Sequence, residues 1–444
     1  MFSLTGLFFL SILVLLFFMS IFKHPFYGII GYLIIYNISP AGQYWGRPLL
    51  HMGVRYNVLM SLAIALGFIL NSKKIEFSAK LHLQEKLFWL LVLVIWLSSF
   101  WGLPGLGTED FHVKLAKVGF FLWMLIRIID DRKKYEIVLW VLVLLGMYLG
   151  YGSLYIDTSS FGRIDIGIGG PDFKEGNFLA AHFAMLFPFV GVLFLLSRKF
   201  FGKLITVVSG ILVVNALVLC RSRGAFLAVV AGVVYALLLA PVKYRKKIVS
   251  LLVVGTVGGF FLVDPGFIDR MGRINADIVN IEEQDDSAGG RIMAWTAAID
   301  MAKDHPLGIG QGNFSRYVGQ YQPEIPGKDT HSTYLRALAE LGLPGLFLIG
   351  AMIWNAFYML RKLKKRIETH DLHHDIFLHV YAQSVALVIF LTAGLFVTET
   401  YIEEFYWILM LPVLLERVID REMRDQGLDD STDAQQMVGF LKGT

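Results

Sequence analysis

The stretch LITVVSGILVVNALVLCRSRGAFLAVVAGVVYALLLA (204–240) decides the class of this protein, because two apolar runs flank a short basic turn in it. Each run approaches the roughly 20 apolar residues that a helix needs to cross a bilayer. Neither run alternates as a membrane β-strand does, and a helix satisfies its own backbone inside lipid. The stretch therefore predicts two membrane helices joined by a very tight turn.

The same pattern recurs along the chain. Of the 444 residues, 56% are hydrophobic and only 17% are charged, whereas a soluble domain is nearer a quarter charged. The hydrophobic share is enough for about a dozen spans. The apolar runs lie at 2–22, 25–43, 54–70, 87–101, 114–129, 136–156, 177–196, 204–220, 224–241, 247–263, 342–360, 376–398 and 404–416. We therefore expect an all-α, polytopic integral membrane protein of about 12–13 transmembrane helices.

This composition excludes several classes of protein: a soluble enzyme, a disordered chain and a disulfide-stapled secreted domain. The net charge is only +4, and the basic residues form short clusters rather than one stripe, so nucleic acid is not an expected partner. Cys220 is the only cysteine, which rules out an intramolecular disulfide and a cysteine-rich metal site. The first 22 residues lack a basic start and a small-residue cleavage site, so we expect a retained span.

The orientation follows from the basic loops, which stay on the cytoplasmic side. Every second loop is basic, at 73–86, 127–134, 198–203, 243–247, 361–366 and 417–424. The other loops, at 102–112, 155–176, 221–223, 264–341 and 398–403, then face outward. We expect four regions: N-terminal membrane helices (1–263), one long outward segment (264–341), C-terminal membrane helices (342–416) and a cytoplasmic tail (417–444).

The outward loops carry an unexpected excess of arginine. Arg221 and Arg223 lie in the tight turn, near the level of the lipid headgroups, and Arg163 lies in another outward loop. A guanidinium binds phosphate through two parallel hydrogen bonds and stays charged when partly desolvated. Simple interfacial anchoring is the alternative for each side chain. Together, these arginines favour a clamp for a diphosphate.

Arg291 follows Gly289-Gly290 and opens a stretch with an apolar face at helical spacing. A helix N-terminus adds free N–H groups and partial positive charge, which favours an anion there. The alternative is a surface arginine paired with Asp285 or Asp286.

His331 is the sharpest candidate for a catalytic residue. It stands in DTHSTYLRALAELGLPG, where Thr330 or Ser332 can cap a helix. The helix dipole favours the neutral imidazole at that place, and a neutral imidazole can accept a proton near pH 7. A structural histidine is the alternative. Arg336 and Glu340 have the spacing of an ion pair within one helix.

Other polar features are weaker. The glycines at 308, 310 and 312 follow no strand, so they indicate a tight turn and not a dinucleotide site. The acidic pairs 282–283, 285–286 and 403–404 lack the arrangement that would place a metal on a diphosphate, so we expect no catalytic metal and no cofactor. For His182, which lies inside a span, we favour an interhelical hydrogen bond.

Four motifs resemble the O-antigen ligase and polymerase superfamily. They are Ser222-Arg223-Gly224, Gly290-Arg291 with Trp295, His305-Pro306-Leu307-Gly308-Ile309-Gly310, and His331-Ser332 followed by Gly342 and Gly345. The order and spacing of all four match across about 175–350. The stretches at 24–40 and 170–189 look more like the exosortase-associated O-glycosylation ligases of that superfamily. Lys174-Glu175-Gly176-Asn177 departs from the paired Asp-Asn-Asn expected there.

The resemblance implies a polytopic, GT-C-like glycosyltransferase on the periplasmic side of a bacterial inner membrane. Such enzymes move a glycan from undecaprenyl diphosphate to a hydroxyl of a lipid, glycan or protein acceptor, with inversion and without a metal. Carried over to this chain, Arg223 and Arg291 hold the diphosphate and His331 activates the acceptor. We also expect the substrates to contact six further residues: Arg221, Arg163, Glu175, Asn177, Asn313 and Ser332.

Two other functions remain as alternatives. A polysaccharide polymerase uses the same donor but extends another lipid-linked chain, and the His331 motif favours the ligase over it. A transporter or flippase would use the arginines as a substrate vestibule, but the two halves show no repeat and no paired broken helices.

Overall fold

The computed structural model describes residues 3–40, 43, 45–75, 80–105, 110–156, 163–164, 168–173, 175–263, 266–268, 288–370, 372 and 374–428. These residues form α-helices, short 3-10 turns and connecting loops, and they contain no β-strand. The all-α class expected from the sequence is therefore confirmed.

Every apolar run of the sequence contains a helix in the structure. The α-helices are α1 (Leu4–Phe22), α2 (Phe26–Asn37), α3 (Arg47–His51), α4 (Tyr56–Leu70), α5 (Leu83–Trp101), α6 (Phe111–Ile128), α7 (Arg132–Gly152), α8 (Gly176–Leu196), α9 (Phe200–Cys220), α10 (Arg223–Leu239), α11 (Arg245–Leu262), α14 (Ala288–Asp304), α15 (Phe314–Tyr321), α16 (Thr333–Thr369), α17 (His374–Ala393) and α18 (Glu403–Asp425). The 3-10 turns are Ser72–Lys74, Ser153–Tyr155 and Pro171–Phe173.

Fewer helices than expected qualify as membrane spans by length and composition. Among the described residues, seven helices qualify: Leu4–Phe22, Leu83–Trp101, Arg132–Tyr155, Gly176–Leu196, Phe200–Cys220, Thr333–Thr369 and Asp375–Ala393. Helices α2, α4 and α10 are apolar but only 12, 15 and 17 residues long, whereas α18 carries charged residues at both ends. The chain is a polytopic, multi-pass membrane protein with these seven candidate spans.

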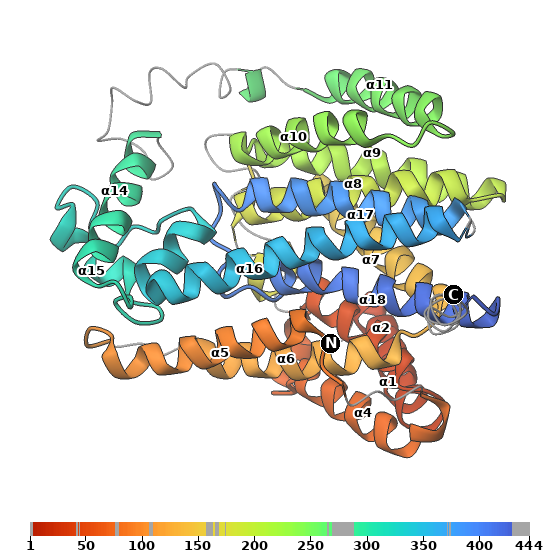
Figure 1. The fold of residues 1–444 in the computed structure, drawn as a ribbon, viewed down its shortest axis with the longest axis horizontal. Helices are drawn as coiled ribbons and strands as arrows, with labels where there is room; N and C mark the ends of the chain where they lie inside the picture. The colour runs from red at the N-terminus through yellow and green to blue at the C-terminus, as the bar shows by residue number, and fades with distance from the viewer. Residues whose placement is uncertain are drawn as a thin grey trace, which may run out of the picture.

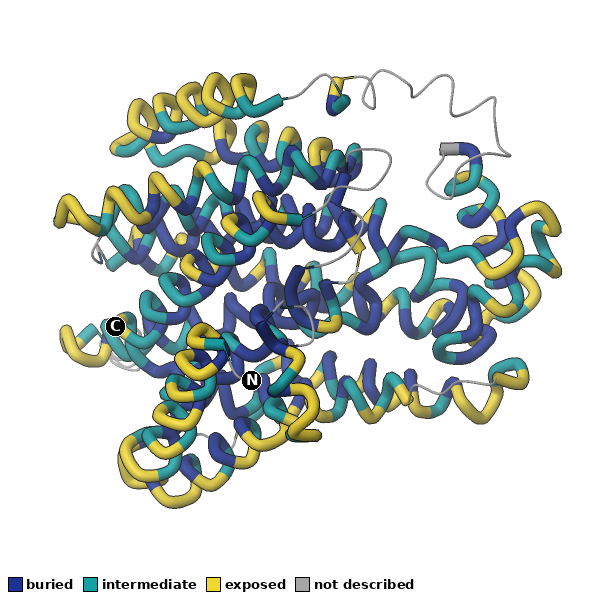
Figure 2. The backbone as a smooth tube through the Cα atoms, turned by 180° about the vertical axis from the view of Figure 1, so that it is seen from behind, coloured by how far each residue is buried: buried dark blue, intermediate teal, exposed yellow. Residues whose placement is uncertain are grey.

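Most of the long helices lie side by side, roughly along the horizontal of Figure 1. Helix α17 packs against both α8 and α10, and the first half of α8 is buried throughout. Close approach is possible because Gly232 of α10 faces Ile389 of α17, where a Cβ would come within 2.2 Å of that side chain. Figure 2 shows the buried backbone in the middle of the molecule and exposed residues on the outer helices.

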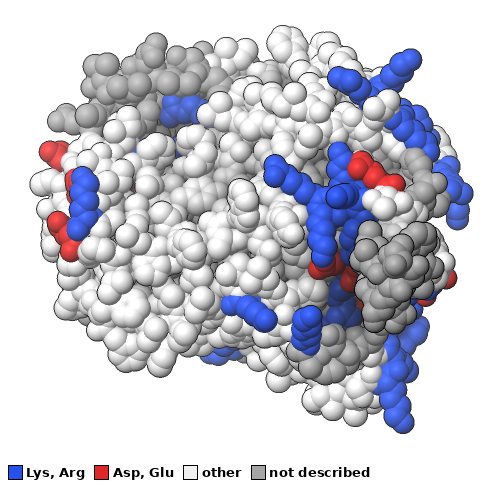
Figure 3. Space-filling model, viewed as in Figure 1, with Lys and Arg blue, Asp and Glu red and all other residues white. Residues whose placement is uncertain are grey.

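The two ends of the bundle differ in charge and in structure. Helices α14, α15 and the start of α16 lie together at one end (Figure 1). Lysine and arginine gather at the opposite end of the visible face, and the surface between is almost uncharged (Figure 3). Helix α16 has 37 residues and bends at Gly342. At 1.5 Å per residue, the part from Leu343 to the basic stretch 361–366 is about 30 Å long, which is close to the thickness of a hydrocarbon core.

Helix α16 bends where the sequence placed the boundary between the outward segment and the next membrane helix. Gly342 has φ 64° and ψ −162°, outside the helical region, and Pro344 follows two residues later. The freed N–H of Leu343 donates to the Pro306 carbonyl at 2.9 Å. The last residues of the segment expected to face outward and the following membrane helix thus form one kinked element.

Candidate functional site

The turn between α9 and α10 presents its two arginines in different ways. Arg221 ends α9 in the left-handed conformation, with φ 46° and ψ 40°, and Arg223 is the first residue of α10. Ser222 caps α10 by accepting a hydrogen bond from the Ala225 N–H. The Arg221 guanidinium lies over Gly266, where a Cβ would come within 2.6 Å of its Cζ. The sequence feature predicted as a tight turn is confirmed.

Helix α14 carries Arg291 in its first turn, as the sequence predicted. Trp295 lies one turn further along, so the two side chains share a face of the helix. The Trp295 indole donates to the Thr330 carbonyl at 3.0 Å, and its ring lies 6.4 Å from that of Phe396. Helix α14 is thereby fixed beside the residue that precedes His331.

His331 is held in a left-handed conformation with φ 46°. The Thr330 hydroxyl forms hydrogen bonds across His331 to the backbone of Ser332. It donates to the Ser332 carbonyl at 3.1 Å and accepts from the Ser332 N–H at 3.3 Å. Ser332 is the N-cap of α16, but its side chain makes no capping hydrogen bond. Among the described residues other than glycine, only Arg221 and His331 have positive φ. Such strain collects at functional sites when neighbouring contacts maintain it.

The loop between α17 and α18, residues 394–402, anchors the start of α16. Thr333, two residues after His331, donates its N–H to the Gly394 carbonyl at 2.9 Å and its hydroxyl to the Val397 carbonyl at 2.7 Å. In return, the Glu399 N–H and the Thr400 hydroxyl donate to Thr333 at 2.9 and 2.8 Å. The position of His331 relative to α17 is therefore fixed by several hydrogen bonds.

The same loop reaches the arginine turn. Phe396 packs on Gly224, where a Cβ would lie 2.5 Å from the Phe396 Cβ, and it also faces Trp295. The loop thus contacts the segments that carry Arg223, Arg291 and His331, the three residues predicted as catalytic. Sequence reasoning assigned no role to it. The polar Thr398-Glu399-Thr400, directly after an apolar run, was the available signal.

A network of charges lies behind His331. Arg336 pairs with Asp329 at 2.5 Å and, as predicted, with Glu340 at 2.8 Å. Burial alone would raise the pKa of Asp329, but the charges of Arg336 and His331 bring it below its usual range. In the 394–402 loop, burial and the charge of Glu404 raise the pKa of Glu399 well above its usual range.

The glycine-rich turn at 308–314 has a structural role. Glu340 accepts hydrogen bonds from the Gly312 and Phe314 N–H groups at 2.8 and 2.9 Å, and from the Tyr401 hydroxyl at 2.7 Å. Gly308 and Gly310 both have positive φ. Asn313, predicted to contact substrate, is buried and donates to the Leu103 and Ile309 carbonyls. The predicted tight turn is present, and Asn313 helps to fix it.

The remaining predicted substrate residues lie near the start of α8. Arg163 is buried, and the next residue pairs with the end of α9 through the Ile164 N–H and the Leu219 carbonyl at 3.2 Å. A Cβ on Gly176 would lie 3.7 Å from Arg163 Nη2, so Arg163 is close to the first residue of α8. Glu175 is exposed at the N-cap of α8, and Asn177 is buried.

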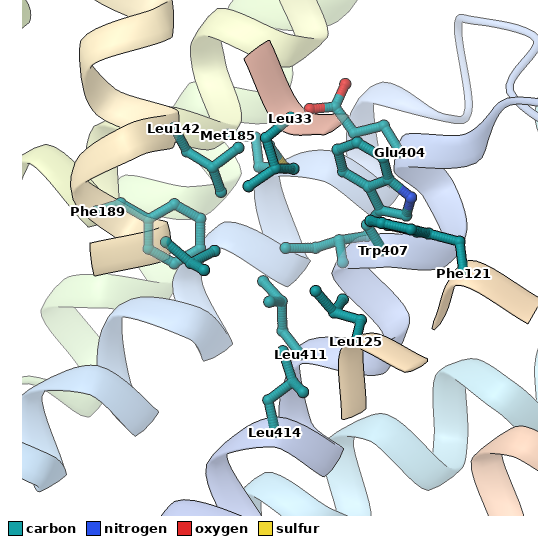
Figure 4. A pocket seen from close by; sticks show the side chains of 12 residues that line it. Leu33, Phe121, Leu125, Leu142, Met185, Phe189, Glu404, Trp407, Leu411 and Leu414 are labelled. Carbon is teal, nitrogen blue, oxygen red and sulfur yellow. The ribbon is translucent and has the colours of Figure 1, made fainter. Parts of the chain in front are cut away.

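The acidic pair at 403–404 is divided between two partners. Glu403 accepts from the Tyr32 hydroxyl at 2.9 Å, whereas Glu404 meets His182 Nδ1 at 2.5 Å. The interhelical hydrogen bond predicted for His182 is confirmed. Glu404 and Trp407 border a small cavity that is otherwise apolar (Figure 4). The described residues include no group of three acidic, histidine or cysteine side chains suited to a metal. The pairs 282–283 and 285–286 lie outside the described residues.

Comparison with known proteins gives a family assignment for part of the chain. No curated protein matches it. Residues 208–350 match the family described as O-antigen ligase. This range begins within α9, ends within α16 and includes Arg221, Arg223, Arg291 and His331. The chain therefore carries an O-antigen ligase family domain, and it is a glycosyltransferase embedded in the membrane.

Proposed function

We propose that this enzyme transfers a glycan from undecaprenyl diphosphate to an acceptor hydroxyl, at the periplasmic face of a bacterial inner membrane. The observation that carries this proposal is the 394–402 loop, which contacts the segments bearing Arg223, Arg291 and His331. Two guanidinium groups and an imidazole near one polar end of an apolar bundle suit a lipid with a diphosphate head. The O-antigen ligase domain supports the same substrate class.

Arg223 and Arg291 bind the diphosphate in this proposal. Each begins or closely follows the start of a helix, where free N–H groups add to the positive potential. Negative charge builds up on the bridging oxygen as the bond to the sugar breaks. Fixed guanidinium groups stabilise that charge more strongly in the transition state than in the bound donor. Arg221 and Arg163 add positive charge at the same end of the bundle.

His331 acts as the general base. It takes the proton of the acceptor hydroxyl while that oxygen forms a bond to the anomeric carbon, on the face opposite the diphosphate. The bond between the anomeric carbon and the diphosphate oxygen breaks, and undecaprenyl diphosphate leaves with the electron pair. Attack from the opposite face inverts the anomeric centre. No nucleotide sugar, metal or cofactor takes part.

The proposal predicts a reaction that can be reconstituted from purified components. Protein in liposomes receives a glycan linked to undecaprenyl diphosphate, EDTA, and either a hydroxyl-bearing lipid or a second molecule of donor. We expect glycan transfer to the lipid acceptor at an undiminished rate in EDTA. Transfer only to the second donor would instead identify a polymerase. Movement of intact donor across the bilayer, without any transfer, would identify a flippase and overturn the proposal.

A further inference from the structure

The charges behind His331 do not balance while that histidine is neutral. Asp329 and Glu340 are both bonded to the single guanidinium of Arg336, at 2.5 and 2.8 Å. Two carboxylates and one guanidinium leave one negative charge in excess. Glu340 is fully buried and, among the described residues, receives only neutral donors besides Arg336, namely two backbone N–H groups and the Tyr401 hydroxyl. A protonated His331 would bring this cluster to neutrality.

Asp329 is the member of the cluster placed to balance the positive charge of a protonated His331. It lies two residues before His331, and its Oδ1 accepts the N–H of the intervening Thr330 at 2.8 Å. Arg336 keeps Asp329 ionised. Because Glu340 shares the same guanidinium, the single positive charge of Arg336 does not neutralise both carboxylates. Helix α16 therefore fixes the carboxylate, while the Thr330 hydroxyl fixes the histidine backbone. In this arrangement, the Asp329 carboxylate would orient and stabilise the His331 base, as a third group does in other catalytic sites.

We propose that Asp329 is a positioning residue for His331, and that the Asp329–Arg336–Glu340 cluster stabilises the imidazolium that forms when His331 accepts the acceptor proton. This inference rests on the proposed function, because it assumes that His331 is the base. Other titratable groups also lie on the segments around His331. They include Arg291 on α14, Arg223 on α10, Lys328 beside Asp329, and Glu399 in the 394–402 loop, whose raised pKa keeps it protonated.

The test uses Asp329→Asn, which removes the negative charge of the side chain and keeps its shape. We expect kcat/KM for transfer to fall about 100-fold, within the range known for acid–base groups, with KM for the donor unchanged. The acid limb of the pH–rate profile should move to lower pH, because the imidazolium loses its compensating charge. Asp300→Asn is the matched control. It removes a partly exposed carboxylate on α14 that pairs only with Lys303 among the described residues, and it should leave rate and profile unchanged.

Two further variants separate this inference from the proposed function and from a folding defect. In a His331→Ala background, Asp329→Asn should cause no additional loss, because Asp329 acts through the imidazole. Asp329→Glu, which restores the charge, should return the acid limb toward its original position. If His331→Ala is inactive but Asp329→Asn keeps the wild-type rate and profile, only the role of Asp329 is wrong. If His331→Ala retains full activity, the proposed function fails as well.

Discussion

Lysine variants of Arg223 and Arg291 test whether the reaction needs the forked geometry of the guanidinium group or only its charge. Lysine keeps the charge at each position but cannot form two parallel hydrogen bonds to a phosphate. We expect Arg223→Lys and Arg291→Lys each to lower kcat/KM at least about tenfold, because each loses one charge-assisted hydrogen bond to the phosphate. Steady-state transfer assays provide the measurement.

Arg316→Lys is the matched control for these two variants. Arg316 lies exposed on α15, where its guanidinium stacks near Tyr317, 5.8 Å from the ring. The exchange there should leave transfer unchanged. Full activity in Arg223→Lys or Arg291→Lys would show that the corresponding arginine supplies charge without bidentate contact.

Glu399 connects the stability of the 394–402 loop to pH. Its carboxyl is fully buried, and neither oxygen has a hydrogen-bond partner among the described residues. Its raised pKa means that the folded protein keeps a proton which the unfolded chain releases near pH 4. The contribution of Glu399 to the free energy of unfolding is therefore complete below about pH 4. It is lost as the pH rises toward the pKa that Glu399 has in the folded protein.

Glu399→Gln removes this dependence, because glutamine is similar in shape and never ionises. We expect its unfolding temperature to exceed that of the wild type by a few degrees at neutral pH, and the difference to vanish near pH 4. Thermal unfolding in detergent across this range measures it. Exposed Glu324 provides the control, Glu324→Gln. A difference that stays constant with pH would contradict the assignment.

At the scale of elements, the sequence predicts helices far better than it predicts their contacts. Apolar runs of sufficient length determine a helix locally, and each expected run contains one. The site instead depends on partners far apart in the chain, such as Thr333 and Thr400, and nothing in the local pattern encodes those pairings. Chemical type indicates Arg223, Arg291 and His331 as candidates for catalytic roles. It could not reveal that the 394–402 loop connects them, or that Asn313 serves the turn.

Gly224 tests that connection between α10 and the loop. In Gly224→Ala, the new Cβ would lie 2.5 Å from the Phe396 Cβ, so the loop has to shift. We expect a loss of about 1–3 kcal/mol in stability, as for other overpacked contacts, and a transfer rate reduced more than tenfold. Thermal unfolding and steady-state transfer assays check both values.

Gly350→Ala, within α16, is the matched exchange, because a Cβ there meets no atom within 4 Å. Alanine favours a helix over glycine by up to about 1 kcal/mol, so this variant should be as stable as the wild type or more so. Equal behaviour of the two glycine variants would mean that Phe396 does not transmit the position of α10 to the site.

At the scale of the whole molecule, the site and the basic clusters occupy opposite ends of the bundle (Figures 1 and 3). The basic end is expected in the cytoplasm, which places the proposed site in the periplasm. Cysteine labelling can test this, since Cys220 is the only cysteine and is buried. In a Cys220→Ala background, Glu324→Cys should react with a membrane-impermeant maleimide applied from the periplasm. Lys364→Cys should react only after lysis. The reverse pattern would contradict the orientation.

The central claim is that this membrane protein is a glycan transferase whose base is His331. Release of undecaprenyl diphosphate from a lipid-linked glycan tests it most directly, with purified protein, a hydroxyl acceptor and no added metal. The account predicts release by the wild type that depends on the acceptor, and release at least about 100-fold slower in His331→Ala of equal thermal stability. Equal release by the two proteins, or no release by the wild type, would contradict it.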